Sequence, residues 1–188
     1  MTTRRLGSLF VTLLLWSGCA DASDTLDLTV HHAVGVDYGD MVANEPVSVV
    51  VDLPDLREEA EYDKHRSALV CCHPASDASA FSLVVVDADM MASTIDLLVE
   101  LRPDEAESFT RLFQYAGSIE SGESLSLLSD GVVMDPAGRS LLSGLCLATQ
   151  PDYELRITLT SAQNHIGLEL GLELVLQMSD TASHCPGP

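Results

Sequence analysis

The chain has 188 residues and a formal net charge of −20 at pH 7, with 29 Asp and Glu against nine Lys and Arg. This length suits one domain with its own hydrophobic core. The acidic excess repels phosphate backbones and anionic lipid surfaces, so binding to nucleic acid is not expected.

The first residues are typical of a secretory signal. Arg4 and Arg5 give a positive start, and the stretch 6–16 is mostly apolar, which matches the n-region and h-region of a signal peptide. The stretch is shorter than the about 20 apolar residues that a transmembrane helix needs. We therefore expect residues 1–18 to be a signal peptide and residues 19–188 to form a single acidic, β-rich domain.

The end of this signal resembles the lipobox of bacterial lipoproteins. Leu15-Trp16-Ser17-Gly18-Cys19 places small residues before a cysteine. The resemblance implies a lipid on Cys19 and a membrane anchor, and, because Ala20 rather than Asp follows, an outer-membrane location. Ala20-Asp21-Ala22 also offers an ordinary signal-peptidase site with cleavage after Ala22. In that case the protein is periplasmic or secreted.

Alternation of apolar and polar residues predicts strands with one buried face. The first alternating segment, 26–38, has His32 on the apolar side and His31 on the polar side. We therefore expect His32 to be a core residue and His31 an exposed one. A second segment, 47–53, ends before Pro54, which cannot donate a ladder hydrogen bond. Three further apolar runs lie at 68–72, 81–87 and 95–101.

One helix is predicted at about 103–116. Pro103 suits a first helical position, and the two acidic residues after it suit the positive end of the helix dipole. The apolar stripe at helical spacing consists of Ala106, Phe109, Leu112, Phe113 and Ala116. Segment 118–143 is rich in turn residues, and its short apolar runs at 125–128 and 131–134 predict small hairpins.

The last two strands have the clearest pattern. Segments 153–160 and 166–178 alternate throughout and are separated by a short turn, so we expect them to pair as a C-terminal β-hairpin. The predicted fold class is mainly β. We expect an antiparallel β-sandwich, of which the immunoglobulin-like fold is one type, with one short helix. Residues 179–188 form a C-terminal tail.

The chain has five cysteines, an odd number for an exported protein, in which thiols tend to pair. Without Cys19 four remain, namely Cys71, Cys72, Cys146 and Cys185. His73 and His184 beside them suggest a zinc site as the alternative. Adjacent cysteines on a strand point to opposite faces, however, which suits two disulfides better than one metal ion. The sequence leaves all three connectivities open.

Two carboxylate pairs are candidate calcium ligands, because calcium takes oxygen ligands. Asp87 and Asp89 have the i, i+2 spacing that places both on one face of a strand end, and Asp37 and Asp40 flank a Tyr-Gly turn. Neither pair lies in an EF-hand or a repeat-type calcium loop, and carboxylates beside turns are commonly turn formers. No other cofactor is expected.

The sequence contains no G-x-S-x-G, H-E-x-x-H, Walker or G-x-G-x-x-G motif. We therefore expect a non-enzymatic structural or interaction module of the cell envelope, with a protein partner there. One alternative is an extracytoplasmic hydrolase that draws its acids from positions such as Asp87 and Glu100. The other is a calcium-stabilised adhesion module.

Overall fold

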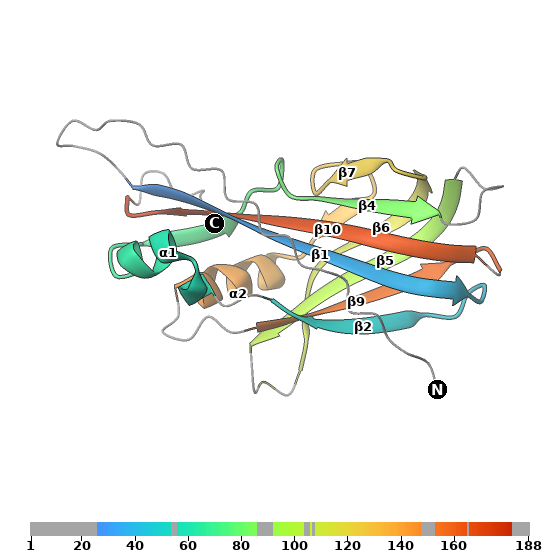
Figure 1. Cartoon of the computed structure of the whole chain (residues 1–188), viewed down its shortest axis with the longest axis horizontal. Coiled ribbons are helices and arrows are strands. Elements are labelled where there is room, and N and C mark those ends of the chain that lie inside the picture. Colours follow the sequence, from blue (N-terminus) through green and yellow to red (C-terminus); the bar gives the residue numbers. More distant parts are fainter. Residues whose placement is uncertain are drawn as a thin grey trace.

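In the residues that it describes, the computed structural model has two antiparallel five-stranded sheets and two α-helices (Figure 1). It describes residues 26–53, 56–85, 92–103, 106, 108–147, 153–164 and 166–181. The expected fold class, a mainly β antiparallel sandwich, is confirmed. The expected signal peptide and lipobox lie outside the described residues, as do most residues of the C-terminal tail.

Sheet A has the strand order β1-β10-β4-β7, and β3 pairs with a further part of β10. Its strands are β1 (Asp27–Met41), β3 (Cys71–Pro74), β4 (Ala80–Val85), β7 (Ser124–Ser126) and β10 (Ile166–Ser179). The last strand in the chain, β10, is thus the central strand of the sheet. It pairs with β1 along one edge, and with β3 and β4 one after the other along the opposite edge.

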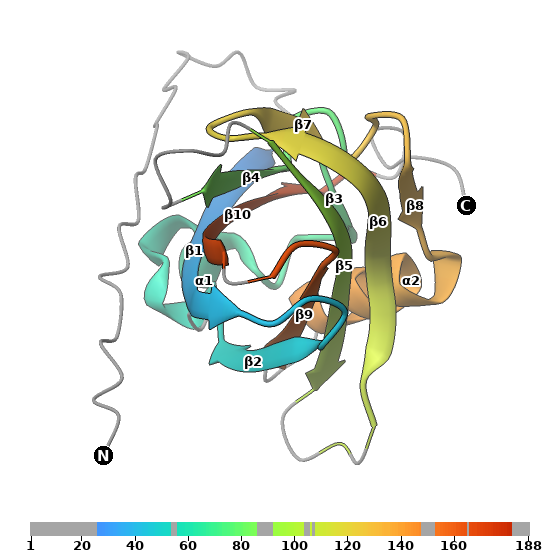
Figure 2. The ribbon, with the colours of Figure 1, turned by 90° about the vertical axis from the view of Figure 1, so that its right-hand side faces the viewer.

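Sheet B has the strand order β2-β9-β5-β6-β8. Its strands are β2 (Val47–Asp52), β5 (Ala92–Pro103), β6 (Thr110–Glu120), β8 (Val132–Met134) and β9 (Tyr153–Ser161). Viewed along the long axis, the strands of the two sheets surround a common interior (Figure 2).

The core lies between the inward faces of the two sheets. The apolar side of each alternating strand supplies it, as in β9, where every second residue from Tyr153 to Ser161 is buried. Phe81 of sheet A stacks on Phe113 of sheet B with ring centroids 5.8 Å apart. The hydroxyl of Tyr38 in β1 donates a hydrogen bond to the carbonyl oxygen of Ile157 in β9 (3.1 Å). Both contacts join one sheet to the other.

The helical elements are short. A 3₁₀ turn (Leu56–Glu58) and helix α1 (Ala60–His65) occupy the charged segment after β2, and Leu56 and Tyr62 anchor them in the core. Helix α2 (Pro136–Cys146) packs against β3 of sheet A and β6 of sheet B. None of the helices in the described part of the chain is long and apolar enough to span a membrane.

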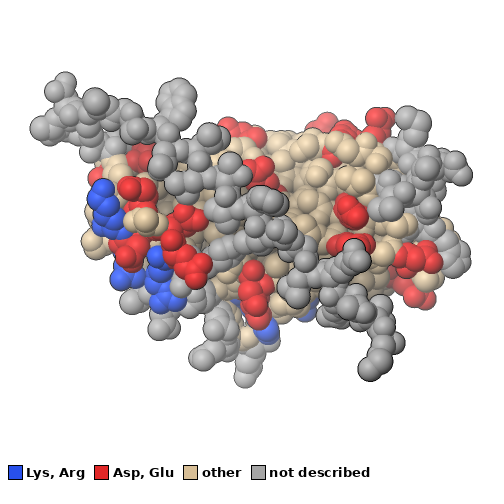
Figure 3. Space-filling model, in the orientation of Figure 1, with Lys and Arg blue, Asp and Glu red and all other residues tan. Residues whose placement is uncertain are grey.

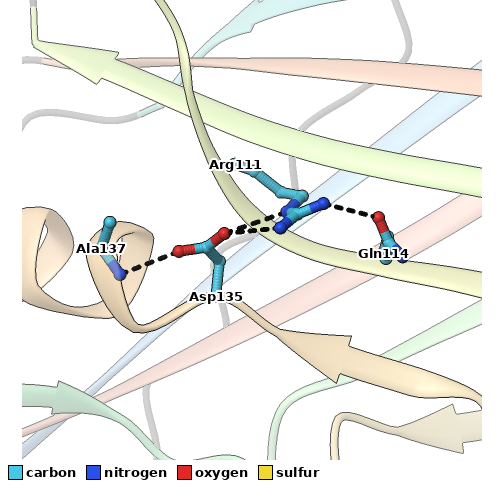
Figure 4. Close-up of polar contacts among 4 residues, drawn as sticks. All are labelled: Arg111, Gln114, Asp135 and Ala137. Carbon is cyan, nitrogen blue, oxygen red and sulfur yellow. Dashed lines mark hydrogen bonds and ion pairs between the residues drawn. The ribbon is translucent and has the colours of Figure 1, made fainter.

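Helix α2 is attached to β6 by a small polar cluster (Figure 4). One oxygen of Asp135 accepts hydrogen bonds from two guanidinium nitrogens of Arg111 (2.8 and 3.0 Å), and the other accepts the backbone N–H of Ala137 (2.9 Å). Asp135 is therefore the N-cap of the helix. The Arg111 hydrogen bond is the main cause of a lowered pKa of the Asp135 carboxyl.

The predicted helix at about 103–116 is wrong. Strand β5 continues to Pro103, and β6 begins at Thr110. The register between these strands shifts where Val99 faces Phe113 and Glu100 faces Arg111, which leaves Leu112 as the extra residue of a β-bulge. Leu112 and Phe113 are consequently both buried. Two consecutive buried residues break the strand alternation and imitate a helical stripe.

The predicted C-terminal hairpin is also wrong. Strands β9 and β10 are joined by a short turn, yet β9 pairs with β2 and β5 while β10 pairs with β1, β3 and β4. Strands β1 and β2 divide between the two sheets in the same way. The loop between β1 and β2 contacts the end of β9, because the backbone N–H of Asn44 donates a hydrogen bond to the carbonyl oxygen of Ser161 (2.7 Å).

Candidate functional site

The outer face of sheet A carries a row of small residues across four strands, which we call the small-residue row. Gly35 of β1 lies opposite Gly171 of β10, Gly171 lies opposite Ser82 of β4, and Ser82 lies opposite Ser124 of β7. The row forms the floor of a hollow of about 290 Å³, to which Ala33, Ala80 and Glu173 also contribute. Side chains of this size leave the strand backbone open to solvent.

The two glycines are not required by the conformation of the strands. Neither has a positive φ. A Cβ at position 35 would meet nothing within 4 Å, and one at position 171 would meet only the Ser82 hydroxyl at 3.0 Å. Glycine inside a strand weakens it and commonly marks a place where a ligand or another backbone approaches closely. The row therefore offers a surface suited to such an approach.

Acidic side chains border the row. Glu169 and Glu173 flank Gly171 on the same face of β10, and Asp37 lies two residues from Gly35 on β1. The five strands of sheet A contain no Lys or Arg. In the view of Figure 3, Asp and Glu are spread over the surface, whereas much of the Lys and Arg lies at the end that carries α1. The electrostatic potential here favours a cationic partner.

A histidine and a carboxylate meet at the margin of the hollow. Nδ1 of His31 lies 2.8 Å from a carboxylate oxygen of Glu173. His31 of β1 lies opposite Val175 of β10, and Ser82 of β4 lies opposite Gly171 of β10. His31 and Ser82 are therefore two strand spacings and four residues apart. This register corresponds to roughly 16 Å between their Cα atoms. Ser82 is therefore out of reach of His31 as a base, and the pair forms no Ser-His-acid arrangement with this hydroxyl.

The prediction for the two histidines is confirmed. His31 is on the solvent side of β1, and His32 is 2% exposed, with its Nε2 lacking a hydrogen-bond partner. Burial, and to a lesser extent the neighbouring His31, lowers the pKa of His32 to about 4. The imidazole is therefore neutral at pH 7 and serves as a core side chain.

His32 makes the stability of the fold depend on pH. Its pKa falls from 6.5 to about 4 on folding. Below pH 6.5 the unfolded chain therefore binds a proton that the folded chain does not bind, and the free energy of unfolding decreases as the pH falls from 6.5 towards 4. We expect the free energy of unfolding to fall by about 2 kcal/mol between pH 7.5 and about pH 5 from this group. Urea titrations at the two pH values measure it. His32→Phe should remove most of this fall, and an equal fall in both proteins contradicts the assignment.

The acidic positions considered for a hydrolase are not brought together in a described cleft. Glu100 accepts a hydrogen bond from Nε of Arg156 (2.6 Å) on the outer face of sheet B. Beside it, the guanidinium groups of Arg102 and Arg156 both lie over the ring of Phe109, at 4.5 and 4.3 Å from its centroid. Asp87 lies outside the described residues. The hydrolase alternative thus gains no support from Glu100.

The calcium candidates stay predictions. A carboxylate oxygen of Asp37 accepts the backbone N–H of Gly39 (2.8 Å), where φ is +60° and the register of β1 shifts. This contact is that of a turn-forming aspartate. Asp87 and Asp89 lie outside the described residues. Among the residues that the structure describes, no group of three or more His, Cys, Asp or Glu is arranged to hold a metal ion.

Of the predicted disulfide cysteines, Cys71 and Cys72 are adjacent in β3, and both are disulfide-bonded. Cys146 ends helix α2, but its side chain lies outside the described part, as do Cys185 and Cys19. The pairing of these cysteines therefore stays a prediction.

No family model matches this chain. A search of curated proteins also found no relative. Among solved structures, the chain is similar to one from Desmodium yellow mottle tymovirus, with 7% identity, 89% of this chain and 94% of that chain covered, and a TM-score of 0.26. A chain from turnip yellow mosaic virus has 10% identity, coverages of 81% and 94%, and a TM-score of 0.26. Likenesses at these TM-scores carry no argument about fold or function.

The small-residue row was not predicted from the sequence. Alternation places Gly35 and Gly171 on the outward sides of their strands. Only the register of β1 against β10, however, places the two glycines opposite each other. The sequence does contain one signal of this row, namely two outward-facing glycines in strands that are otherwise rich in branched and long side chains.

Proposed function

We propose that this protein is a non-enzymatic interaction module of the cell envelope and that it binds a protein partner through the small-residue row of sheet A. The observation that carries this proposal is the open backbone at Gly35 and Gly171, which costs strand stability without any requirement from the internal geometry. Close approach of a partner to the strand backbone explains why glycine occupies both positions.

The acidic border of the row specifies the chemistry of the partner. Asp37, Glu169 and Glu173 favour a segment that presents Lys or Arg, and the overall charge of −20 disfavours nucleic acid and anionic lipid. Charges at the edge of an interface act mainly on the association rate and on salt sensitivity. Binding should therefore weaken as the salt concentration rises.

Site-specific photo-crosslinking tests the contact surface in the native envelope. Gly35→benzoylphenylalanine is expected to give a discrete crosslinked product, because this position lies in the proposed interface. The matched control is Val50→benzoylphenylalanine, since Val50 is 49% exposed on sheet B. Adding Glu169→Lys should lower the yield at position 35 several-fold. Equal yields at positions 35 and 50 contradict the proposed surface.

The membrane anchor of this proposed module is the lipid on Cys19, which places it at the outer membrane. Intact mass spectrometry of protein purified from its native membrane is expected to show a chain that begins at Cys19 and carries acyl groups. A mature chain that begins at Ser23 without lipid overturns the anchor and leaves a periplasmic or secreted protein. The photo-crosslinking result does not depend on this outcome.

A further inference from the structure

The two cysteines of β3 cannot have the same partner. Successive residues of a strand face opposite sides, and here Cys72 is 2% exposed in the core whereas Cys71 is half-buried. The peptide bonds of the described residues are all trans. An extended trans strand holds adjacent thiols apart, so each must be bonded to a cysteine elsewhere in the chain. With five cysteines in total, the partners come from Cys19, Cys146 and Cys185.

Helix α2, which ends at Cys146, packs into the core next to β3. Leu142 of this helix is fully buried and belongs to the same core cluster as Cys72. Gly138 lies against the backbone of Arg111 and Leu112 in β6. The helix also packs against β3, whose inward-facing thiol is that of Cys72.

We propose that Cys72 is bonded to Cys146 and that Cys71 is bonded to Cys185. The second bond follows from the pairing of Cys71 with Ser179 at the end of β10. Cys185 follows Ser179 by six residues, which span at most about 20 Å, so its thiol is within reach of Cys71. The assignment of Cys185 also rests on the proposed lipidation of Cys19, which removes that thiol from the pairing.

Formation of each bond is an oxidation. Two thiols lose two protons and two electrons and become one disulfide, and the oxidant is the disulfide of a thiol–disulfide oxidoreductase, which is reduced to a dithiol. The reaction proceeds by thiolate attack through a mixed disulfide. The Cys72 to Cys146 bond links sheet A to the helix that packs on sheet B. The Cys71 to Cys185 bond links the tail to the edge of sheet A.

Removal of one partner at a time tests the pairing. Exported, full-length Cys146→Ser is denatured without reduction and alkylated, and fragment masses between the adjacent cysteines then locate the label. We expect the label on Cys72 in this variant and on Cys71 in Cys185→Ser. Label on Cys71 in Cys146→Ser, or on Cys185, overturns the proposal.

Double variants decide the question if a single variant fails to accumulate. The pair Cys72→Ser with Cys146→Ser should leave no thiol to alkylate, because the other bond stays intact. The pair Cys71→Ser with Cys146→Ser should leave two. The reverse result overturns the proposal. A label on Cys19 in the wild-type protein shows instead that the lipid anchor is absent, which separates failure of the proposed function from failure of the pairing.

Discussion

Replacing Gly138 by alanine is expected to destabilise the fold by about 3 kcal/mol or more, because helix α2 has no room for a side chain there. A Cβ at this position would lie 2.1 Å from the carbonyl oxygen of Arg111 and 2.7 Å from the Cα of Leu112. Both atoms are backbone atoms at the bulge of β6, so relief requires a shift of the helix or of the strand. Either shift separates Asp135 from Arg111.

The matched control is Gly144→Ala in the same helix. A Cβ at Gly144 would meet nothing within 4 Å, so this variant should gain about 0.5 to 1 kcal/mol from the higher helix propensity of alanine. Urea unfolding followed by circular dichroism measures both, since the one tryptophan, Trp16, lies in the expected signal peptide. Similar stabilities of the two variants contradict the close packing of α2 on β6.

Replacing Phe113 by alanine is expected to cost about 4 kcal/mol, the range for truncation of a fully buried aromatic side chain. The Phe113 ring is fully buried and stacks on Phe81 of the opposite sheet. Tyr115, which is also on β6, packs on the same Phe81 ring at 5.3 Å between centroids. The substitution therefore leaves a cavity at the contact that joins the two sheets.

Leu128→Ala provides the comparison for this truncation, because Leu128 is 67% exposed. Its effect should stay within about 0.5 kcal/mol. The same unfolding measurement applies, with the slope against urea concentration checked for constancy. A loss of stability in Phe113→Ala no greater than in Leu128→Ala contradicts the position of Phe113 in the core.

The alternating strands could be predicted, and their partners could not. The pattern of β1, β9 and β10 predicts both the strands and their buried faces, including that of His32, because side-chain burial has the period of the backbone. Pairing depends on which strands share a sheet, and no local pattern carries that information. The short turn between β9 and β10 suggested a hairpin, whereas each strand pairs in a different sheet.

The two errors about helices have different physical origins. The bulge at Leu112 makes a strand imitate a helix, whereas Pro136 and Gly138 give the first turn of α2 the composition of a turn. Asp135-Pro136 was an available signal for α2, as an N-cap followed by a proline at the first helical position. The glycine that allows the close packing, Gly138, strengthened the turn interpretation instead. The small-residue row could not be predicted either, because it exists only through strand register.

The interior positions of β9 and β10 in the two sheets determine when the domain can fold during synthesis. Strands β1, β3 and β4 all need β10, and β2 and β5 both need β9, so most sheet contacts form only after residues 153–179 have been synthesised. Among the described strands, the pairs that need neither β9 nor β10 are the hairpin of β5 and β6, with β8 beside it, and the short pairing of β4 with β7. A nascent chain that lacks its C-terminal segment therefore remains largely unfolded. It exposes apolar strand faces to chaperones or to aggregation until its final strands are made.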